Sequence, residues 1–195
     1  MIKLIVGIDP GVNTGIALWD YENRKLVDLF TLKIHRAMEF VLQLKNSTSS
    51  YGDTSLDLII FEDARSVKYQ HSAAKAQGAG SIKRDCTIWE DFFKDYKFPY
   101  LRSLPNKTKI DREVFEKMTG WKKPSNNHGR DAAMIVYGLS DKQVQIKKMR
   151  QEHIEKVRFP DIGGYMKQRA ATKETLRRIV TKKAKTIKPY QKKIK

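Results

Sequence analysis

The stretch from Leu4 to Gly15 constrains the fold of this chain more than any other. Residues 4–8 form a short apolar run typical of a buried strand, and the run ends on Asp9. A proline and a glycine follow, and they favour a turn because proline presets its φ and glycine accepts a positive one. A second apolar run, 16–19, begins at hairpin distance. The pattern therefore predicts a carboxylate at the rim of a sheet, where it either caps the turn or holds a cation.

Strands and helices continue along the first 140 residues. Residues 25–32 alternate as a third strand would, which favours three antiparallel strands in a row. Residues 37–44 suit a helix packed on that sheet. Another buried strand is predicted at 56–61, and it also ends on a carboxylate, Glu62. Further elements are expected as helices over 82–93, 110–118 and 128–139 and a strand over 100–104.

The charge of the chain is uneven. The formal net charge is +17, and residues 141–195 hold 18 of the 39 basic side chains but only 5 of the 22 acidic ones. A cationic end on a nearly neutral body indicates a polyanion partner, most simply nucleic acid, although a solvated tail is the alternative. We therefore divide the chain into a body, 1–140, and a basic C-terminal extension, 141–195, with a helix expected over 172–185.

Three acidic residues share a pattern that favours metal chemistry. Asp9 and Glu62 each end a buried strand, and Asp131 is expected in the first turn of a buried helix, three residues after His128. Carboxylates gathered at one sheet edge repel each other unless cations lie between them, and Mg²⁺ prefers such oxygen ligands. Two ions would support phosphodiester hydrolysis. His128 has two interpretations, as a helix cap or as a metal ligand or proton-handling group.

These motifs resemble the RuvC family of Holliday junction resolvases. The resemblance is carried by Gly-Ile-Asp-Pro-Gly-Val-Asn-Thr-Gly at 7–15, the strand ending in Glu62, and His-Gly-Arg-Asp-Ala-Ala at 128–133. It extends to the small-residue stretch 73–80, which is similar to the family's helix at the DNA face and dimer contact. Pro105 and Lys109 resemble the family's Pro-x-x-x-Lys, whose lysine meets the DNA backbone.

The resemblance implies an RNase H-like fold, in which three antiparallel strands are followed by parallel ones and helices flank the sheet. It implies a homodimer that makes paired nicks in four-way DNA junctions with Mg²⁺ or Mn²⁺, two ions per site. The catalytic and metal-binding positions would be Asp9, Glu62, His128 and Asp131. The candidate DNA-binding residues are Arg65, Lys68, Lys75, Lys83, Arg84, Lys107 and Lys109.

Two departures from the family pattern are visible. The segment between Lys109 and His128 is shorter than in typical bacterial members, and the basic extension has no counterpart. Both features look more like a phage-encoded resolvase. The extension also raises nonspecific affinity for phosphates, which favours a broad preference for branched DNA, such as forks and flaps, over strict junction specificity.

Other classes of protein fit less well. The turn at 9–15 is also similar to the phosphate loop of actin-like ATPases, but those proteins need two such domains. A non-catalytic nucleic-acid-binding protein would have no reason to end two buried strands on acids. The single cysteine, Cys86, fits a reducing cytoplasm, and we expect a cytoplasmic protein because we find neither a signal-peptide pattern nor a membrane span.

Overall fold

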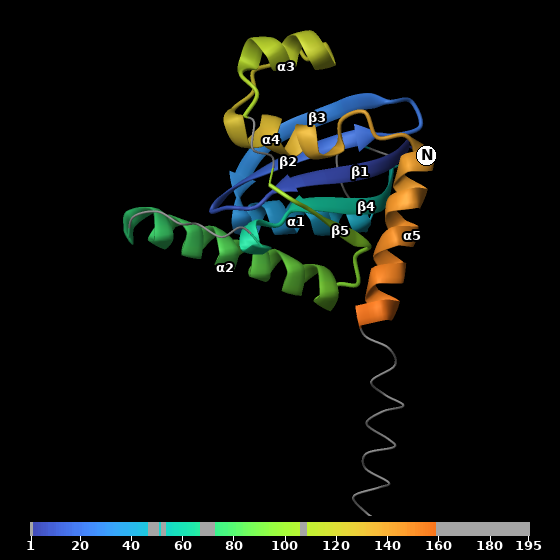
Figure 1. Cartoon of the computed structure of the whole chain (residues 1–195). Helices are drawn as coiled ribbons and strands as arrows, with labels where there is room; N and C mark the ends of the chain where they lie inside the picture. Colours follow the sequence, from blue (N-terminus) through green and yellow to red (C-terminus); the bar gives the residue numbers. More distant parts are fainter. Residues whose placement is uncertain (1, 47–50, 52–53, 67–72, 106–108, 159–195) are drawn as a thin grey trace, which may run out of the picture. The chain divides into compact units, whose positions relative to one another are not determined.

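The computed structural model describes residues 2–46, 51, 54–66, 73–105 and 109–158. In this part of the chain, a mixed sheet has the strand order β3-β2-β1-β4-β5 (Figure 1). The central strand β1 pairs antiparallel with β2 and parallel with β4, while β2–β3 is antiparallel and β4–β5 parallel. The strands are β1 (Ile2–Asp9), β2 (Asn13–Asp20), β3 (Lys25–Lys33), β4 (Thr54–Glu62) and β5 (Tyr100–Ser103). This order confirms the predicted RNase H-like mixed sheet.

The helices also follow the sequence pattern. The predicted helices over 37–44, 110–118 and 128–139 are confirmed with small shifts in their ends, and the one over 82–93 is part of a longer helix that begins at Ala73. The helix predicted over 128–139 ends earlier, at Val136, shortly before Gly138, whose φ of 78° is not helical. The helices are α1 (Ile34–Lys45), the 3₁₀ turn η1 (Ala64–Ser66), α2 (Ala73–Asp95), α3 (Arg112–Thr119), α4 (Asn127–Val136) and α5 (Asp141–Arg158).

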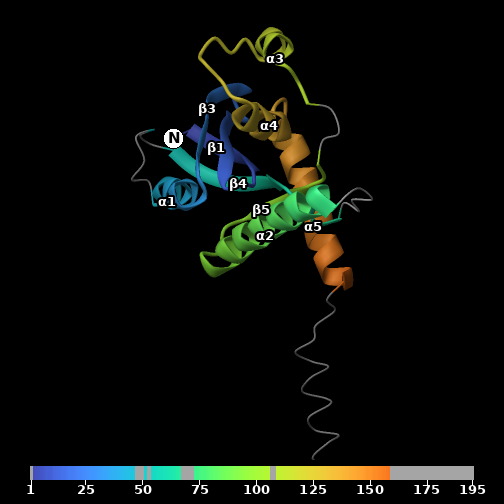
Figure 2. The same ribbon diagram turned by 90° about the vertical axis from the view of Figure 1, so that its left-hand side faces the viewer.

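Each face of the sheet carries its own hydrophobic core. On one face, alternate residues of β1 and β4, such as Ile8 and Phe61, pack with Trp89 and Phe93 of α2 and with residues of α1. On the other face, the intervening strand residues pack against α4 and α3. Figures 1 and 2 both show α4 on the opposite side of the sheet from α1 and α2. Two-sided burial explains why β1 and β4 read as continuous apolar runs.

Helix α4 lies unusually close to the sheet because two glycines face it. A Cβ atom on Gly7 of β1 would lie 2.3 Å from the backbone oxygen of Ala132, and one on Gly15 of β2 would lie 2.0 Å from the oxygen of His128. Real Cβ atoms do not approach backbone so closely, so only glycine permits this packing. The first two turns of α4 are thereby held directly over the end of β1.

The chain divides by its internal contacts into two compact units, Met1–Lys148 and Met149–Lys195. The first unit includes the beginning of α5, where Val144 is buried in the same core as α4. The helix predicted over 172–185 lies outside the described residues, as does most of the basic extension. Among the described residues, every helix is too short or too polar to cross a membrane.

Candidate active site at the ends of β1 and β4

Asp9 and Glu62 are the last residues of two neighbouring parallel strands. In the register of these strands, Ile8 of β1 pairs with Phe61 of β4. Asp9 and Glu62 each come directly after one member of this pair. Ile8 and Phe61 both pack in the core on the α2 side. Because side chains alternate along a strand, the residues that follow them belong to the α4 face of the sheet. The two strands thus bring two carboxylates to the same edge and the same face.

Helix α4 supplies the other two predicted site residues. The side chain of Asn126 caps the helix, since its Oδ1 accepts a hydrogen bond from the backbone N–H of Gly129 at 2.9 Å. The same oxygen accepts from the Thr31 hydroxyl at 2.7 Å, which ties the helix start to β3. The helix begins at Asn127, so the predicted place of Asp131 in the first turn was wrong, and this residue lies in the second turn.

His128 directly contacts Asp9. The two atoms His128 Nδ1 and Asp9 Oδ2 lie 2.8 Å apart, a distance at which the imidazole N–H donates to the carboxylate. The histidine side chain is about half exposed and the aspartate only 15% exposed, so one partner faces solvent while the other is largely covered. The cap of α4 is Asn126, not His128, which removes the cap interpretation of this histidine.

The environment of Asp9 penalises its negative charge. Burial raises the pKa of this carboxyl, the neighbouring Asp131 raises it further, and the hydrogen bond and charge of His128 oppose the rise. Lys109 also lowers the pKa of Asp9. The Lys109 ammonium lies 4.0 Å from Asp131 Oδ2 and is mostly exposed. The structure therefore brings together three of the four predicted catalytic residues and one predicted DNA-binding lysine.

The donor set fits a hard divalent cation in its chemistry. Asp9, Glu62 and Asp131 offer carboxylate oxygens and His128 an imidazole nitrogen. The pKa of Asp9 is raised mainly by burial, which penalises its ionised form, and a bound cation would stabilise that form. In the described residues, no three Asp, Glu, His or Cys side chains already form a group that could hold a metal. The observed arrangement is a bonded Asp9–His128 pair, and ligation of an ion requires these side chains to turn toward it.

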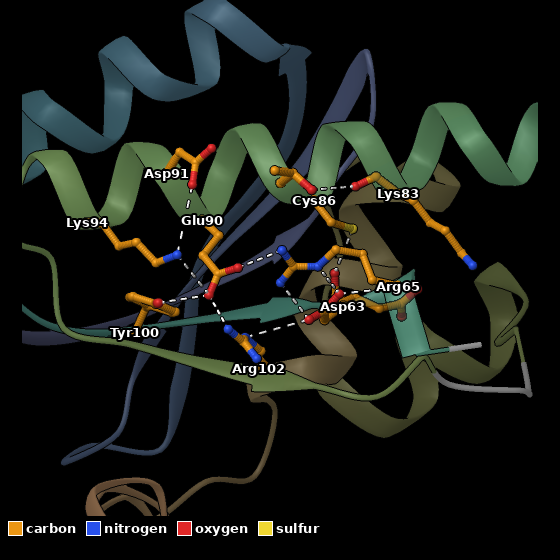
Figure 3. A network of polar contacts seen from close by, with 11 residues as sticks. Asp63, Arg65, Lys83, Cys86, Glu90, Asp91, Lys94, Tyr100 and Arg102 are labelled. Carbon is orange, nitrogen blue, oxygen red and sulfur yellow. Dashed lines mark hydrogen bonds and ion pairs between the residues drawn. The ribbon is translucent and has the colours of Figure 1, made fainter. Parts of the chain in front are cut away.

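The predicted DNA-binding residues fall in different places. Arg65 lies in η1 and is bound by acidic side chains (Figure 3). Lys83 and Arg84 lie in α2, where Arg84 is mostly exposed and 3.5 Å from Asp85. Lys75 is in the first turn of the same helix. Lys68 and Lys107 lie outside the described residues.

Sequence reasoning missed the residues that position the site. From the sequence, Gly7 and Gly15 were identified only as motif residues, whereas in the structure they allow the backbone of α4 to pack closely on β1 and β2. Arg130 is buried, and its guanidinium donates to the Ser125 backbone oxygen at 2.9 Å and to the Asn127 side chain, which fixes the segment before α4. An arginine two residues before a pair of alanines, in a helix predicted to be buried, was the available signal.

A second missed group is a network of buried ion pairs next to Glu62. Asp63 and Glu90 are buried and bind two arginines, one from η1 and one from β5. Glu90 interrupts the apolar pattern of α2, and this interruption was the available signal. Figure 3 shows the network between α2 and the strands.

The sequence matches no protein-family model and no curated protein. Among solved structures, the chain is similar to Thermus thermophilus RuvC in complex with a Holliday junction substrate, with 16% identity, 68% of this chain and 89% of that chain covered, and a TM-score of 0.45. Another Thermus thermophilus RuvC structure gives 15% identity, coverage of 68% and 90%, and a TM-score of 0.42. Both TM-scores are below 0.5, so the roles assigned to residues of this chain rest on its own geometry.

Proposed function

We propose that this protein is a metal-dependent endonuclease that cuts branched DNA and resolves four-way junctions by paired nicks. The observation that carries the proposal is the gathering of Asp9, His128, Asp131 and Lys109 on the face of the sheet that receives Glu62. Carboxylates and an imidazole at one edge, beside an exposed cation, match what hydrolysis of a phosphodiester requires.

Each residue has a distinct role in this proposal. Asp9, Glu62 and Asp131 would hold two Mg²⁺ or Mn²⁺ ions, which when bound supply an activated water and stabilise the leaving oxygen. His128 is exposed enough to meet the substrate and would serve as a ligand or pass a proton at Nδ1. Lys109, with an exposed ammonium beside Asp131, would bind the phosphate next to the cut.

The charge of the chain supports DNA as the substrate. The net charge is +17, and residues 141–195 hold 18 of the 39 basic side chains but none of the four site residues. Diffuse lysine contacts bind phosphates without reading bases, and this favours selection by DNA shape over selection by sequence. Paired nicks need two symmetric sites, so we propose a homodimer that uses the small-residue part of α2.

Cleavage assays with four substrates test the proposal. Purified protein is incubated with a four-way junction, a replication fork, a flap and a linear duplex, each with Mg²⁺, Mn²⁺ or EDTA. We expect metal-dependent paired nicks in the junction and none in the duplex. Equal cutting of forks and flaps would assign a broader branched-DNA nuclease, and binding without cutting under every metal condition would assign a non-catalytic DNA-binding protein.

The dimer is tested separately. Sedimentation at micromolar concentration, with and without a junction, is expected to show two subunits per particle. A monomer under both conditions would contradict the proposed pairing of two sites.

A further inference from the structure

Four charged side chains and a tyrosine form a closed network next to Glu62. Arg65 donates to both carboxylate oxygens of Asp63, from Nε at 2.8 Å and from a terminal nitrogen at 2.7 Å, and its other terminal nitrogen lies 2.5 Å from Glu90. Glu90 also accepts from Tyr100 at 2.9 Å and from Arg102. Two acidic and two basic groups balance each other in a site where both acids are less than 10% exposed.

This network closes around the end of β4. The N–H of Asp63 donates to the Ser103 oxygen at 2.8 Å, and the thiol of Cys86 lies 3.5 Å from the backbone oxygen of Glu62. The residue after Glu62 is therefore fixed by its backbone and by its side chain. The network occupies the α2 side of the sheet (Figure 3), whereas the strand register assigns Glu62 to the α4 side.

We propose that Arg65 is a positioning residue for Glu62: it binds Asp63 and Glu90 together and so fixes the end of β4 at the proposed metal site. This inference rests on the proposed function. In this role Arg65 acts on the site through Asp63, the residue after Glu62, and makes no contact with DNA phosphate. A guanidinium suits this role because its planar fork can bind two carboxylates at once, which a lysine ammonium cannot do with the same geometry.

The two possible roles of Arg65 predict opposite results for Arg65→Lys. Lysine keeps a positive charge that can still meet a phosphate, but it loses the bidentate contact with Asp63. A positioning role therefore predicts weaker metal binding with unchanged DNA affinity. A phosphate role predicts metal binding like that of the wild type.

The experiment uses the full-length protein and three readouts. Mn²⁺ binding is titrated by electron paramagnetic resonance without DNA, the half-saturating Mg²⁺ concentration is measured for junction cleavage, and junction affinity is measured in EDTA at several salt concentrations. Arg102→Lys perturbs the same two carboxylates from β5. Lys94→Ala is the matched control, because Lys94 lies at the exposed margin of the network, 3.6 Å from Glu90.

We expect both lysine variants to raise the half-saturating Mn²⁺ and Mg²⁺ concentrations by about tenfold, the size of effect seen when groups that orient metal ligands are removed. Junction affinity in EDTA and its salt dependence should match the wild type, and Lys94→Ala should change neither metal value. A folded Arg65→Lys with normal Mn²⁺ binding would overturn the inference. If junction affinity in EDTA also falls in that variant, Arg65 is assigned to phosphate binding instead.

The remaining outcomes are also decisive. If circular dichroism shows that Arg65→Lys does not fold, Arg102→Lys decides, and if neither variant folds the network serves the fold alone and the inference is overturned. A wild type that binds Mn²⁺ but cuts no DNA contradicts the proposed nuclease, while the Mn²⁺ titration still decides the role of Arg65. A wild type that binds no Mn²⁺ overturns both.

Discussion

Gly15 of β2 lies against the backbone of His128, so that a methyl group on Gly15 would be 2.0 Å from the His128 carbonyl oxygen. This contact decides where the first turn of α4 lies. Because Asp9 is the last residue of β1 and pairs with Gly15 of β2, the same contact brings the histidine ring to the aspartate. A glycine in a strand thus acts on the chemistry of the site through the distance between two backbones.

Replacing Gly15 with alanine should displace α4. The added methyl group would meet backbone, which cannot rotate away as a side chain can, so we expect the free energy of unfolding to fall by about 1–3 kcal/mol. Cleavage should fall more than this loss of stability alone would cause. Thermal unfolding and junction cleavage measure the two effects. Gly80→Ala in α2 is the control for stability alone, since nothing in the chain lies within 4 Å of the added methyl group and alanine favours a helix. Its cleavage is not compared, because Gly80 lies in the proposed dimer contact. Wild-type stability in Gly15→Ala would contradict the close packing.

Substitutions at His128 separate its possible roles. If the position needs only a metal ligand, His128→Asp should keep substantial cleavage at saturating Mg²⁺, because a carboxylate also binds this ion. His128→Ala should lose most of the activity in either role. Single-turnover cleavage at saturating enzyme measures both variants, and an alanine variant as fast as the wild type would remove His128 from the site.

The fold could be predicted where local pattern decides structure. The apolar runs before Asp9 and Glu62 identified both central strands and placed a carboxylate at the end of each. The helix bearing His128 and Asp131 was also predicted, although its start was misplaced by less than a turn, because the capping role of Asn126 was not recognised.

Contacts between distant segments could not be predicted in the same way. The approach of His128 to Asp9 depends on the lack of a side chain at Gly15, and nothing local to β2 reveals what will pack there. Likewise, Arg65 was predicted as a DNA-binding residue, and its contact with Glu90 could not be foreseen because Glu90 is remote in sequence. A single sequence shows residue types and their spacing, whereas these relationships depend on which surfaces meet.

Acid should weaken the protein through Glu90. This carboxyl is buried and faces Arg65 from η1, Arg102 and Tyr100 from β5, and Lys94 from its own helix. Burial alone would raise its pKa, but the hydrogen bonds from the arginines and the tyrosine outweigh burial and lower the pKa from 4.5 to about 2. The stabilisation is therefore complete above about pH 4.5 and is lost as the pH falls toward 2.

The expected size of this loss is on the order of 3 kcal/mol. Urea unfolding between pH 2 and 7 measures it, and Glu90→Gln should be less stable at pH 7 and show a weaker dependence on pH. Glu39→Gln, which alters an exposed pair with Arg36, is the control and should change stability by less than about 1 kcal/mol. Parallel pH profiles for Glu90→Gln and the wild type would show that other groups cause the acid sensitivity.

Removal of residues 149–195 should weaken DNA binding without stopping cleavage. The truncated protein ends at Lys148, so that Val144, which belongs to the core of the first unit, is kept. The deleted segment holds 15 of the 39 basic residues, and each phosphate that the protein no longer binds should reduce the slope of log affinity against log salt by about 0.9. Junction titrations at several salt concentrations measure this, with circular dichroism as the folding control. An unchanged affinity and slope would assign the segment another role, such as binding a protein partner.

The most direct test of the proposed site is a comparison of cleavage and binding by Asp9→Asn. Asparagine keeps the shape of the side chain but removes the charge that would hold a metal, and Glu62→Gln makes the same change at the end of the neighbouring strand. We expect both variants to lose paired nicking of a four-way junction in Mg²⁺ while they bind the junction as tightly as the wild type, or slightly more tightly, because a negative charge near phosphate is gone. Nicking by Asp9→Asn within about tenfold of the wild-type rate, a difference of only about 1.4 kcal/mol in the barrier, would contradict the assignment of this carboxylate to a metal site.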